Sequence, residues 1–247
     1  MRRIRLTLDY IGTSYAGWQI QPGKDTIEGR VEQALFRLTG EEIKVVASGR
    51  TDAGVHALEQ VAHFDTGTDF DLRAYTNGIN VFLPPDIRVT DARVVPDTFH
   101  ARFDAKRKTY EYRFYVSKVD RAVLYNRAHR LQSMPDLTAL NEAAALFVGE
   151  HDFAAFMSSG SDVKTTVRTV YSALFAAQSE SEFTFEVSAN GFLYNMVRKM
   201  VGALIKISEN KLTSADISRA LADPASTNLP YVAPACGLYL KRVEYEN

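Results

Sequence analysis

A short segment places a carboxylate, a guanidinium and a hydroxyl between glycines: residues 48–57 read Ser-Gly-Arg-Thr-Asp-Ala-Gly-Val-His-Ala. Gly49 and Gly54 permit a tight turn and let a bulky partner approach the backbone closely. Apolar stretches on both sides predict strands, so the turn would present Asp52 at the end of a sheet, where rigid scaffolds often hold functional groups. A carboxylate there can act as a nucleophile or as a general base. The structural alternative is an Asx-turn, in which the aspartate bonds its own backbone.

Positive charge is concentrated near the middle of the chain. Residues 99–130 hold nine lysines and arginines against three acidic residues, although the whole chain carries a net charge of −1. Such a local excess is typical of a surface that binds phosphate groups. It is equally typical of a strand edge that charge keeps from aggregating.

Tyr110 stands directly beside the most basic run of this region, Lys106-Arg107-Lys108. Its ring could stack on a nucleic-acid base while the cations hold the sugar-phosphate backbone. Tyr110 also shares one face of a predicted strand with Tyr112 and Phe114, so it could instead be a core aromatic.

Several classes of site are disfavoured by composition. Cys236 is the only cysteine, which excludes an intrachain disulfide and a thiolate metal cluster. The five histidines are scattered without metal-ligand spacing, so we expect structural roles for them and no metal. The sequence shows neither a secretory apolar region nor a membrane span, and we therefore expect a cytoplasmic protein with no membrane partner.

Periodicity of the apolar residues predicts the secondary structure. In the first half we expect strands at 4–10, 43–47, 60–64 and 88–95, a helix between Thr26 and Gly40, and a helix at 72–79. In the second half we expect strands at 108–116, 169–176, 182–188 and 237–245, a helix between Asp136 and Gly149, and helices at 192–207 and 214–221. Turn and capping residues fix most of these limits.

The order of elements predicts an α+β protein of two mixed α/β lobes with predominantly antiparallel sheets and a basic cleft between them. The N-terminal lobe, residues 1–103, would carry the Asp52 loop. The C-terminal lobe, residues 104–247, would carry Tyr110 and the helix at 192–207.

Arg198 lies on that helix, just beyond the edge of its apolar arc at 100° per residue. An arginine at such a boundary can reach inward to a buried acid, or can extend along the helix flank into water. Lys199 and Lys206 fall on the far side, where we expect them to face water or RNA phosphate.

Several motifs occur in the order found in the TruA family of tRNA pseudouridine synthases, which the sequence resembles over nearly its whole length. The longest is Gly-Arg-Thr-Asp-Ala-Gly-Val-His-Ala at 49–57. The other matching segments are Asp9-Tyr10, Gly17-Trp18-Gln19, Gln21-Pro22, Thr26-Ile27-Glu28-Gly29, Phe99-His100-Ala101-Arg102-Phe103, Lys108-Thr109-Tyr110, Ala189-Asn190-Gly191-Phe192, Met196-Val197-Arg198 and Val201-Gly202.

The resemblance implies an isomerase that converts uridine to pseudouridine at positions 38, 39 and 40 of the tRNA anticodon stem-loop. It implies that Asp52 is the catalytic aspartate, that Tyr110 contacts the target base and that Arg198 lies beside the aspartate. It further implies a homodimer that uses no cofactor. The reaction involves no redox change and imports no group, so one well-placed carboxylate is chemically sufficient.

Further substrate contacts are hypotheses from the residues themselves. The target base must leave its stack, and we expect Arg50, two residues before Asp52, to fill the vacated space. Basic side chains near Tyr110 are expected to hold the RNA backbone: Arg102, Lys106, Arg107 and Lys108.

Two alternatives remain. A pseudouridine synthase for another RNA would share the same residues. A non-catalytic tRNA-binding or RNA-folding protein would use the basic stretch and the aromatics without Asp52, and an Asp52→Asn variant distinguishes it because only an enzyme would lose turnover. A hydrolase is disfavoured because no second carboxylate accompanies Asp52 in its motif.

Overall fold

The chain divides into two units in the computed structural model, which describes residues 1–160, 163–225, 227 and 229–246. Unit 1 comprises Met1–Lys106 with the last strand, and unit 2 comprises Arg107–Leu238. Both units are mixed α/β with mainly antiparallel strand pairs, which confirms the predicted fold class. The last strand, which we expected in the C-terminal lobe, belongs to unit 1. The basic cleft stays a prediction.

Unit 1 is built on strands from both ends of the chain. Its strands are β1 (Arg2–Tyr10), β2 (Val46–Ala47), β3 (His56–Thr66), β4 (Ile87–Val95) and β10 (Leu238–Tyr245). β1 runs antiparallel between β3 and β4, whereas β10 runs parallel to β3. β2 pairs antiparallel with β3 at Ala62 and His63, whereas β10 pairs with β3 at His56 and Ala57. One face of β1 is fully buried, as its alternation predicts.

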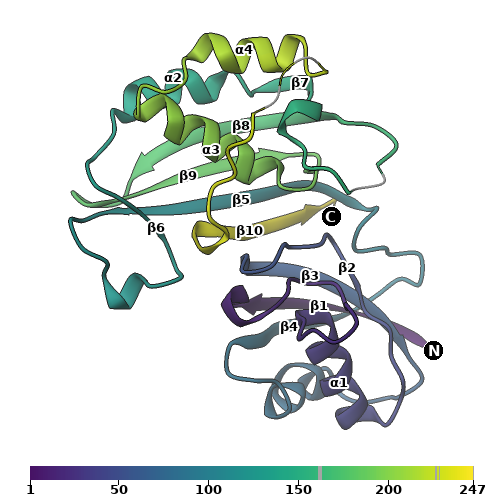
Figure 1. The fold of residues 1–247 in the computed structure, drawn as a ribbon. Helices are drawn as coiled ribbons and strands as arrows, with labels where there is room; N and C mark the ends of the chain where they lie inside the picture. The colour runs from purple at the N-terminus through teal and green to yellow at the C-terminus, as the bar shows by residue number, and fades with distance from the viewer. Residues whose placement is uncertain (161–162, 226, 228, 247) are drawn as a thin grey trace. The chain divides into compact units, whose positions relative to one another are not determined.

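The helix of unit 1, α1 (Ile27–Thr39), packs on the sheet through one apolar face (Figure 1). The Thr26 side chain accepts a hydrogen bond from the Gly29 backbone N–H and caps the first turn. Gly40 ends the helix in the left-handed conformation at φ 76°, which glycine adopts without a Cβ penalty. Both predicted limits of this helix are confirmed.

Two predicted elements of unit 1 differ in length or in helix type from the prediction. Of the strand expected at 43–47, only β2 forms, because the Val45 N–H donates to the Glu32 carboxylate on α1 at 3.0 Å and not to a strand. The helix expected at 72–79 is a π-helical turn at Ala74–Gly78 followed by a 3₁₀ turn at Ile79–Val81. Apolar periodicity does not distinguish these forms from an α-helix.

Unit 2 is built on strands in the order β5-β9-β8-β7. Its strands are β5 (Ala105–Val116), β6 (His129–Leu131), β7 (Gly149–Asp152), β8 (Val167–Ala177) and β9 (Glu182–Ala189). All neighbours in this order pair antiparallel, and β6 runs parallel to the end of β5. Phe114 and Phe183 stack in the core at 4.6 Å between ring centroids. The short strands β6 and β7 were not predicted.

Three helices accompany these strands: α2 (Leu137–Ala145), α3 (Met196–Ser208) and α4 (Ser214–Ala222) (Figure 1). The Asp136 carboxylate caps α2 by accepting from two backbone N–H groups, as predicted. α4 begins with a capping box between Thr213 and Asp216. Among the described residues, no helix combines the length and apolar character needed to cross a bilayer.

α3 begins four residues later than predicted, because Asn195 adopts φ 60° and interrupts the helical pattern. The prediction that Lys199 faces water or RNA is wrong. Its side chain is buried, with 8% exposed, and its ammonium donates to the backbone carbonyls of Ala155 and Met157 at 3.2 and 3.1 Å. A long, flexible lysine satisfies its charge locally in this way, and desolvation lowers its pKa.

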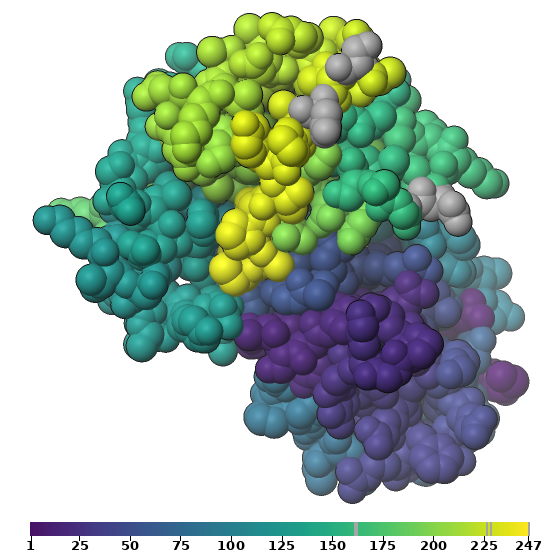
Figure 2. Space-filling view, viewed as in Figure 1, coloured from purple at the N-terminus to yellow at the C-terminus, as the bar shows by residue number. Residues whose placement is uncertain are grey.

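The segment leading to β10 crosses α3 on the surface of unit 2, in yellow over green in Figure 2. It approaches closely at Gly202, where an added Cβ would lie 2.4 Å from the Tyr231 carbonyl oxygen. The Lys206 ammonium lies 5.6 Å from the centre of the Tyr231 ring and pairs with Glu209 at 2.7 Å. Gly202 is therefore required by packing.

His63 is a buried structural histidine on β3. Its Nδ1 accepts the Ala101 backbone N–H at 3.2 Å, which ties β3 to the segment before β5. Burial, followed by the nearby charges of Arg3 and His100, lowers the pKa of His63 from 6.5 to about 4. The folded protein therefore holds this imidazole neutral at pH values where an unfolded chain would protonate it.

Acidification should consequently destabilise unit 1 through His63. The unfolded imidazole binds a proton below pH 6.5, while the folded one does not until about pH 4, so the free energy of unfolding falls across this window. We expect a loss of about 2 kcal/mol between pH 7 and pH 4.5. Denaturant unfolding of the wild type and of His63→Asn at both pH values measures it. Equal pH sensitivity in the two proteins would contradict the assignment.

Candidate active site

Asp52 lies in a turn that backbone geometry closes tightly. The Val55 N–H donates to the Asp52 carbonyl oxygen at 3.1 Å, and Gly54 takes φ 78° at the third position of the turn. A positive φ at this position is the requirement of a type II turn, which explains the glycine. The Asp52 side chain is half-buried and that of Arg50 is exposed.

A buried hydrogen-bond network holds the residues before Asp52. The hydroxyls of Thr51 and Tyr10 share a hydrogen bond of 2.8 Å, and the Gln60 side-chain amide donates to the Tyr10 hydroxyl and to the Gly49 carbonyl. The Ser48 hydroxyl donates to the Gln60 side-chain oxygen at 2.7 Å. Burial raises the pKa of Tyr10 to about 12, so its hydroxyl keeps its proton at physiological pH.

The segment after β1 also supports the Asp52 loop. The Trp18 N–H donates to the Thr51 carbonyl at 3.0 Å. Gly17 takes φ 95°, and a Cβ there would lie 2.6 Å from that same carbonyl oxygen. Only a glycine permits this approach, so the Asp52 loop rests directly on the backbone of residues 17–18.

The far side of the loop is fixed by His56. Its Nδ1 accepts the Gly12 backbone N–H at 3.0 Å, and its ring packs on Tyr239 of β10 at 4.6 Å between centroids. Together these contacts clamp residues 48–56 between β1, the following segment and β10. The loop therefore has little freedom to change shape when a substrate binds.

Glu28 lies close enough to Arg50 for their charges to interact. Burial raises the pKa of Glu28. Two interactions oppose this rise: the Ile20 backbone N–H donates to the Glu28 carboxylate at 2.7 Å, and Arg50 contributes a positive charge. Sequence reasoning missed Tyr10, Gln60 and Glu28 as supports of the loop. Tyr10 and Glu28 lie within the matching segments Asp9-Tyr10 and Thr26-Ile27-Glu28-Gly29, whereas no motif contained Gln60.

Tyr110 lies on β5 in unit 2, where it is half-buried. Its ring meets that of Phe192 edge to face, with centroids 5.1 Å apart and an interplanar angle of 85°. Phe192 follows β9 and precedes α3, so the loop between them fixes the orientation of the tyrosine. Tyr112, the next residue on the same strand face, is fully buried in the core.

Arg198 is oriented by two acceptors within unit 2. Its Nε donates to the Ala233 carbonyl and its Nη1 donates to the Asn195 side-chain oxygen, both at 2.8 Å. The Asn195 amide nitrogen in turn donates to the Ser158 hydroxyl at 3.1 Å. Asparagine tolerates the left-handed conformation found here, which places its side chain back toward Arg198.

The predicted backbone-binding residues fall in both units. Arg102 is exposed on a turn of unit 1, and Lys106 pairs with Glu246 at 3.4 Å. Arg107 lies over the ring of Tyr171 at 4.6 Å in unit 2, and Lys108 faces Ala189 across the β5–β9 pair. In the described part of the chain, no group of three histidine, cysteine, aspartate or glutamate side chains could hold a metal ion.

The model of a protein family described as "tRNA pseudouridine synthase" matches residues 7–104 and 143–246. The chain belongs to the tRNA pseudouridine synthase family. Two relatives named tRNA pseudouridine synthase A agree with this assignment over their full length: that of Ruminiclostridium cellulolyticum is 41% identical and that of Caldicellulosiruptor bescii 42% identical, each covering 99% of this chain and 100% of its own. The family that the motifs resembled is thus confirmed.

A solved complex of Cbf5, Nop10 and Gar1 also aligns with this family member. The alignment covers 98% of this chain and 58% of the other, at a TM-score of 0.36 and 14% identity. The family assignment does not depend on it.

Substitution of Gly17 tests whether the Asp52 loop depends on this close approach. Gly17→Ala should lower the free energy of unfolding by roughly 2 to 4 kcal/mol, because the Cβ meets the Thr51 carbonyl, and should reduce pseudouridine formation. Gly23→Ala is the matched control, since Gly23 has φ 71° but no atom within 4 Å of its Cβ position, and it should cost only about 1 kcal/mol. Thermal denaturation and an activity assay that gave the same result for both variants would contradict the packing argument.

Proposed function

We propose that this family member isomerises uridine to pseudouridine in the anticodon stem-loop of tRNA, at positions 38, 39 and 40, with Asp52 as the essential carboxylate. Family membership supports the reaction. The observation that carries the role of Asp52 is the clamp on its backbone, formed by the Tyr10–Thr51 hydrogen bond and by the Trp18 N–H. A site that must act on one bond of a large substrate requires such preorganisation.

The reaction breaks the bond from C1′ of the ribose to N1 of uracil and forms a bond from C1′ to C5. The hydrogen on C5 is lost to solvent and N1 gains one, so the atoms balance without a redox partner. An ionised carboxylate serves this sequence either by attacking the substrate or by removing a sugar proton. Both roles need the carboxylate at a fixed position, which the rigid loop supplies.

We assign substrate binding to three further side chains. Arg50 is exposed beside Asp52 and fills the space of the extruded base. Tyr110 contacts the base, which fits its half-buried ring held edge to face by Phe192. Arg198 binds the substrate through a guanidinium that Asn195 and Ala233 orient.

The RNA backbone is proposed to be held by four positively charged side chains of the basic stretch: Arg102, Lys106, Arg107 and Lys108. A homodimer is proposed on the family resemblance, and a cytoplasmic location is proposed as the sequence analysis expected.

Asp52→Asn should abolish turnover while RNA binding persists. Wild-type protein incubated with unmodified tRNA transcript labelled with tritium at uridine C5 should release the label, and Asp52→Asn should release it at least about a thousandfold more slowly. The dissociation constant for tRNA should stay equal or fall, since a negative charge near phosphate is removed. Asp91→Asn, a surface substitution in unit 1, is the control and should turn over normally. A wild type that binds tRNA without releasing label would favour the non-catalytic alternative.

Arg50→Ala should slow the chemical step by roughly 10- to 100-fold in single turnover, since the opened stack is no longer filled. A transcript whose target uridine faces a mismatch should reduce this defect, because an unpaired base costs less to extrude. Arg37→Ala, which removes an arginine stacked on Phe82 elsewhere in unit 1, provides the comparison. A normal rate for Arg50→Ala on the paired substrate would refute the assigned role.

A further inference from the structure

Unit 1 contains a continuous run of rings and cations that no step of the proposed reaction uses. The run starts at Arg5, whose guanidinium lies 4.9 Å from the Tyr245 ring centre, and continues through Phe99 at 5.2 Å from Tyr245. It passes on through buried His63, 6.0 Å from Phe99, to His100 at 5.0 Å from His63. The run therefore connects the sheet to the turn at residues 99–104.

That turn is held rigidly by hydrogen bonds. The Asp104 N–H donates to the His100 carbonyl at 3.0 Å, and the His100 N–H donates to the Asp104 carboxylate at 2.8 Å. The backbone N–H groups of Arg102 and Phe103 donate to His100 Nδ1 at 3.2 and 3.3 Å. The Tyr245 hydroxyl donates to the Ala101 carbonyl at 2.7 Å. These bonds fix the backbone of the turn, and with it the direction in which each Cα–Cβ bond leaves it.

Phe103 stands at the end of the run, and 74% of it is exposed. One side of its ring packs on His100, with centroids 4.2 Å apart and planes inclined by 30°. The Arg102 guanidinium lies 5.9 Å from the ring centre. The hydrogen-bonded turn and the His100 contact hold this phenylalanine at the surface, where it presents a large apolar area beside a cation.

We propose that Phe103 and Arg102 form a stacking platform for an unpaired base of the RNA substrate, remote in the sequence from the Asp52 loop. An aromatic ring supplies a stacking surface for any base, and an adjacent arginine supplies a contact to phosphate or a second stacking plane. The proposal rests on the proposed function only in taking RNA as the ligand. It adds a binding determinant to the residues that act on the target uridine.

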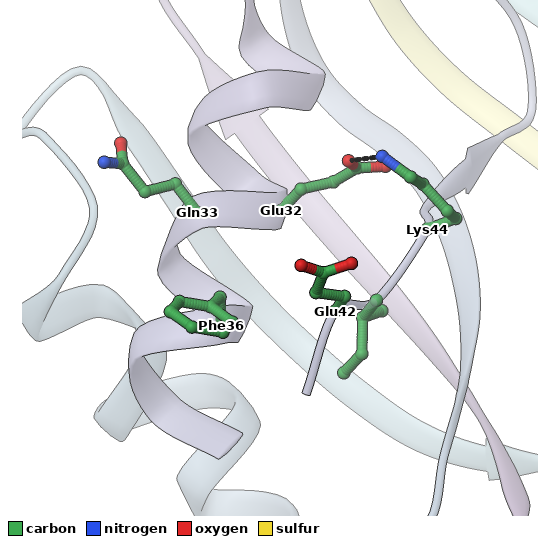
Figure 3. Close-up of a pocket in the computed structure, with 6 residues that line it drawn as sticks. Glu32, Gln33, Phe36, Glu42 and Lys44 are labelled. Atoms are coloured by element: carbon green, nitrogen blue, oxygen red, sulfur yellow. Dashed lines mark hydrogen bonds and ion pairs between the residues drawn. The ribbon is translucent and has the colours of Figure 1, made fainter. Parts of the chain in front are cut away.

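Local charge distinguishes this phenylalanine from Phe36, another exposed aromatic of unit 1. Phe36 is 51% exposed on α1 and borders a shallow hollow with Glu32, Glu42 and Lys44 (Figure 3). The Lys44 ammonium is paired with Glu32 at 2.8 Å, so this hollow presents a net acidic surface that repels phosphate. At Phe103 the acid of the turn, Asp104, is engaged by the His100 N–H and a cation lies over the ring.

Titration of unmodified tRNA transcript tests the platform. Phe103→Ala should weaken binding roughly 5- to 150-fold, with an unchanged slope of log affinity against log salt, whereas Arg102→Ala should reduce that slope by about 1. Phe103→Leu should bind as weakly as Phe103→Ala, because it restores apolar area but no stacking plane. Phe36→Ala should bind like the wild type.

A direct readout comes from Phe103→Trp. The natural Trp18 is the only tryptophan and is buried, so RNA should quench the fluorescence of the new indole if a base stacks on it. Wild-type affinity of Phe103→Ala, or unquenched fluorescence at saturating RNA, would overturn the platform while leaving the role of Asp52 intact. The proposal would also be overturned if Phe103→Leu recovered RNA binding and Phe103→Ala changed the sedimentation coefficient of the protein. That pair of results would assign Phe103 to a protein contact. Loss of label release in the wild type would instead count against the proposed function alone.

Discussion

The hydrogen bond between the Tyr10 and Thr51 hydroxyls fixes the geometry on which the candidate site depends. It joins the end of β1 to the residue preceding Asp52, and Gln60 on β3 donates to the Tyr10 hydroxyl and to the Gly49 carbonyl. Because these groups are buried, an unmade bond would leave a polar atom without water, and the network is therefore satisfied as a whole or disrupted as a whole. The position of the Asp52 carboxylate therefore depends on buried groups that support the loop from behind.

The same dependence on backbone contacts explains the glycines of unit 1. Gly17 leaves room for the Thr51 carbonyl, and Gly54 adopts the positive φ that the turn requires. Residues of the motifs around Asp52 are therefore needed for packing as well as for chemistry. In unit 2, Asn195 interrupts helix formation and in doing so brings an amide to Arg198. In both units, a departure from regular structure positions a side chain that we assign to the substrate.

Elements whose signals are local could be predicted from sequence. The Thr26 and Gly40 limits of α1, the Asp136 cap and the β8–β9 pair follow from capping and alternation, and the motif around Asp52 identified the family. Contacts between distant segments could not be predicted. Glu32 captures the Val45 N–H and shortens a strand, and Lys199 turns inward to two carbonyls although helical periodicity placed it outside. Pairing of β10 with β3 is likewise invisible to local patterns.

That parallel pairing has a consequence for how the protein is made. Translation delivers the Asp52 loop early, whereas Tyr239, which covers His56, is added only after the whole of unit 2. Until then the nascent N-terminal unit exposes an open strand edge at His56 and Ala57, a ready template for unwanted pairing with other chains. The loop therefore gains its contact with β10 only after the segments of unit 2 have been synthesised, which couples the maturation of the site to synthesis of a distant part of the chain.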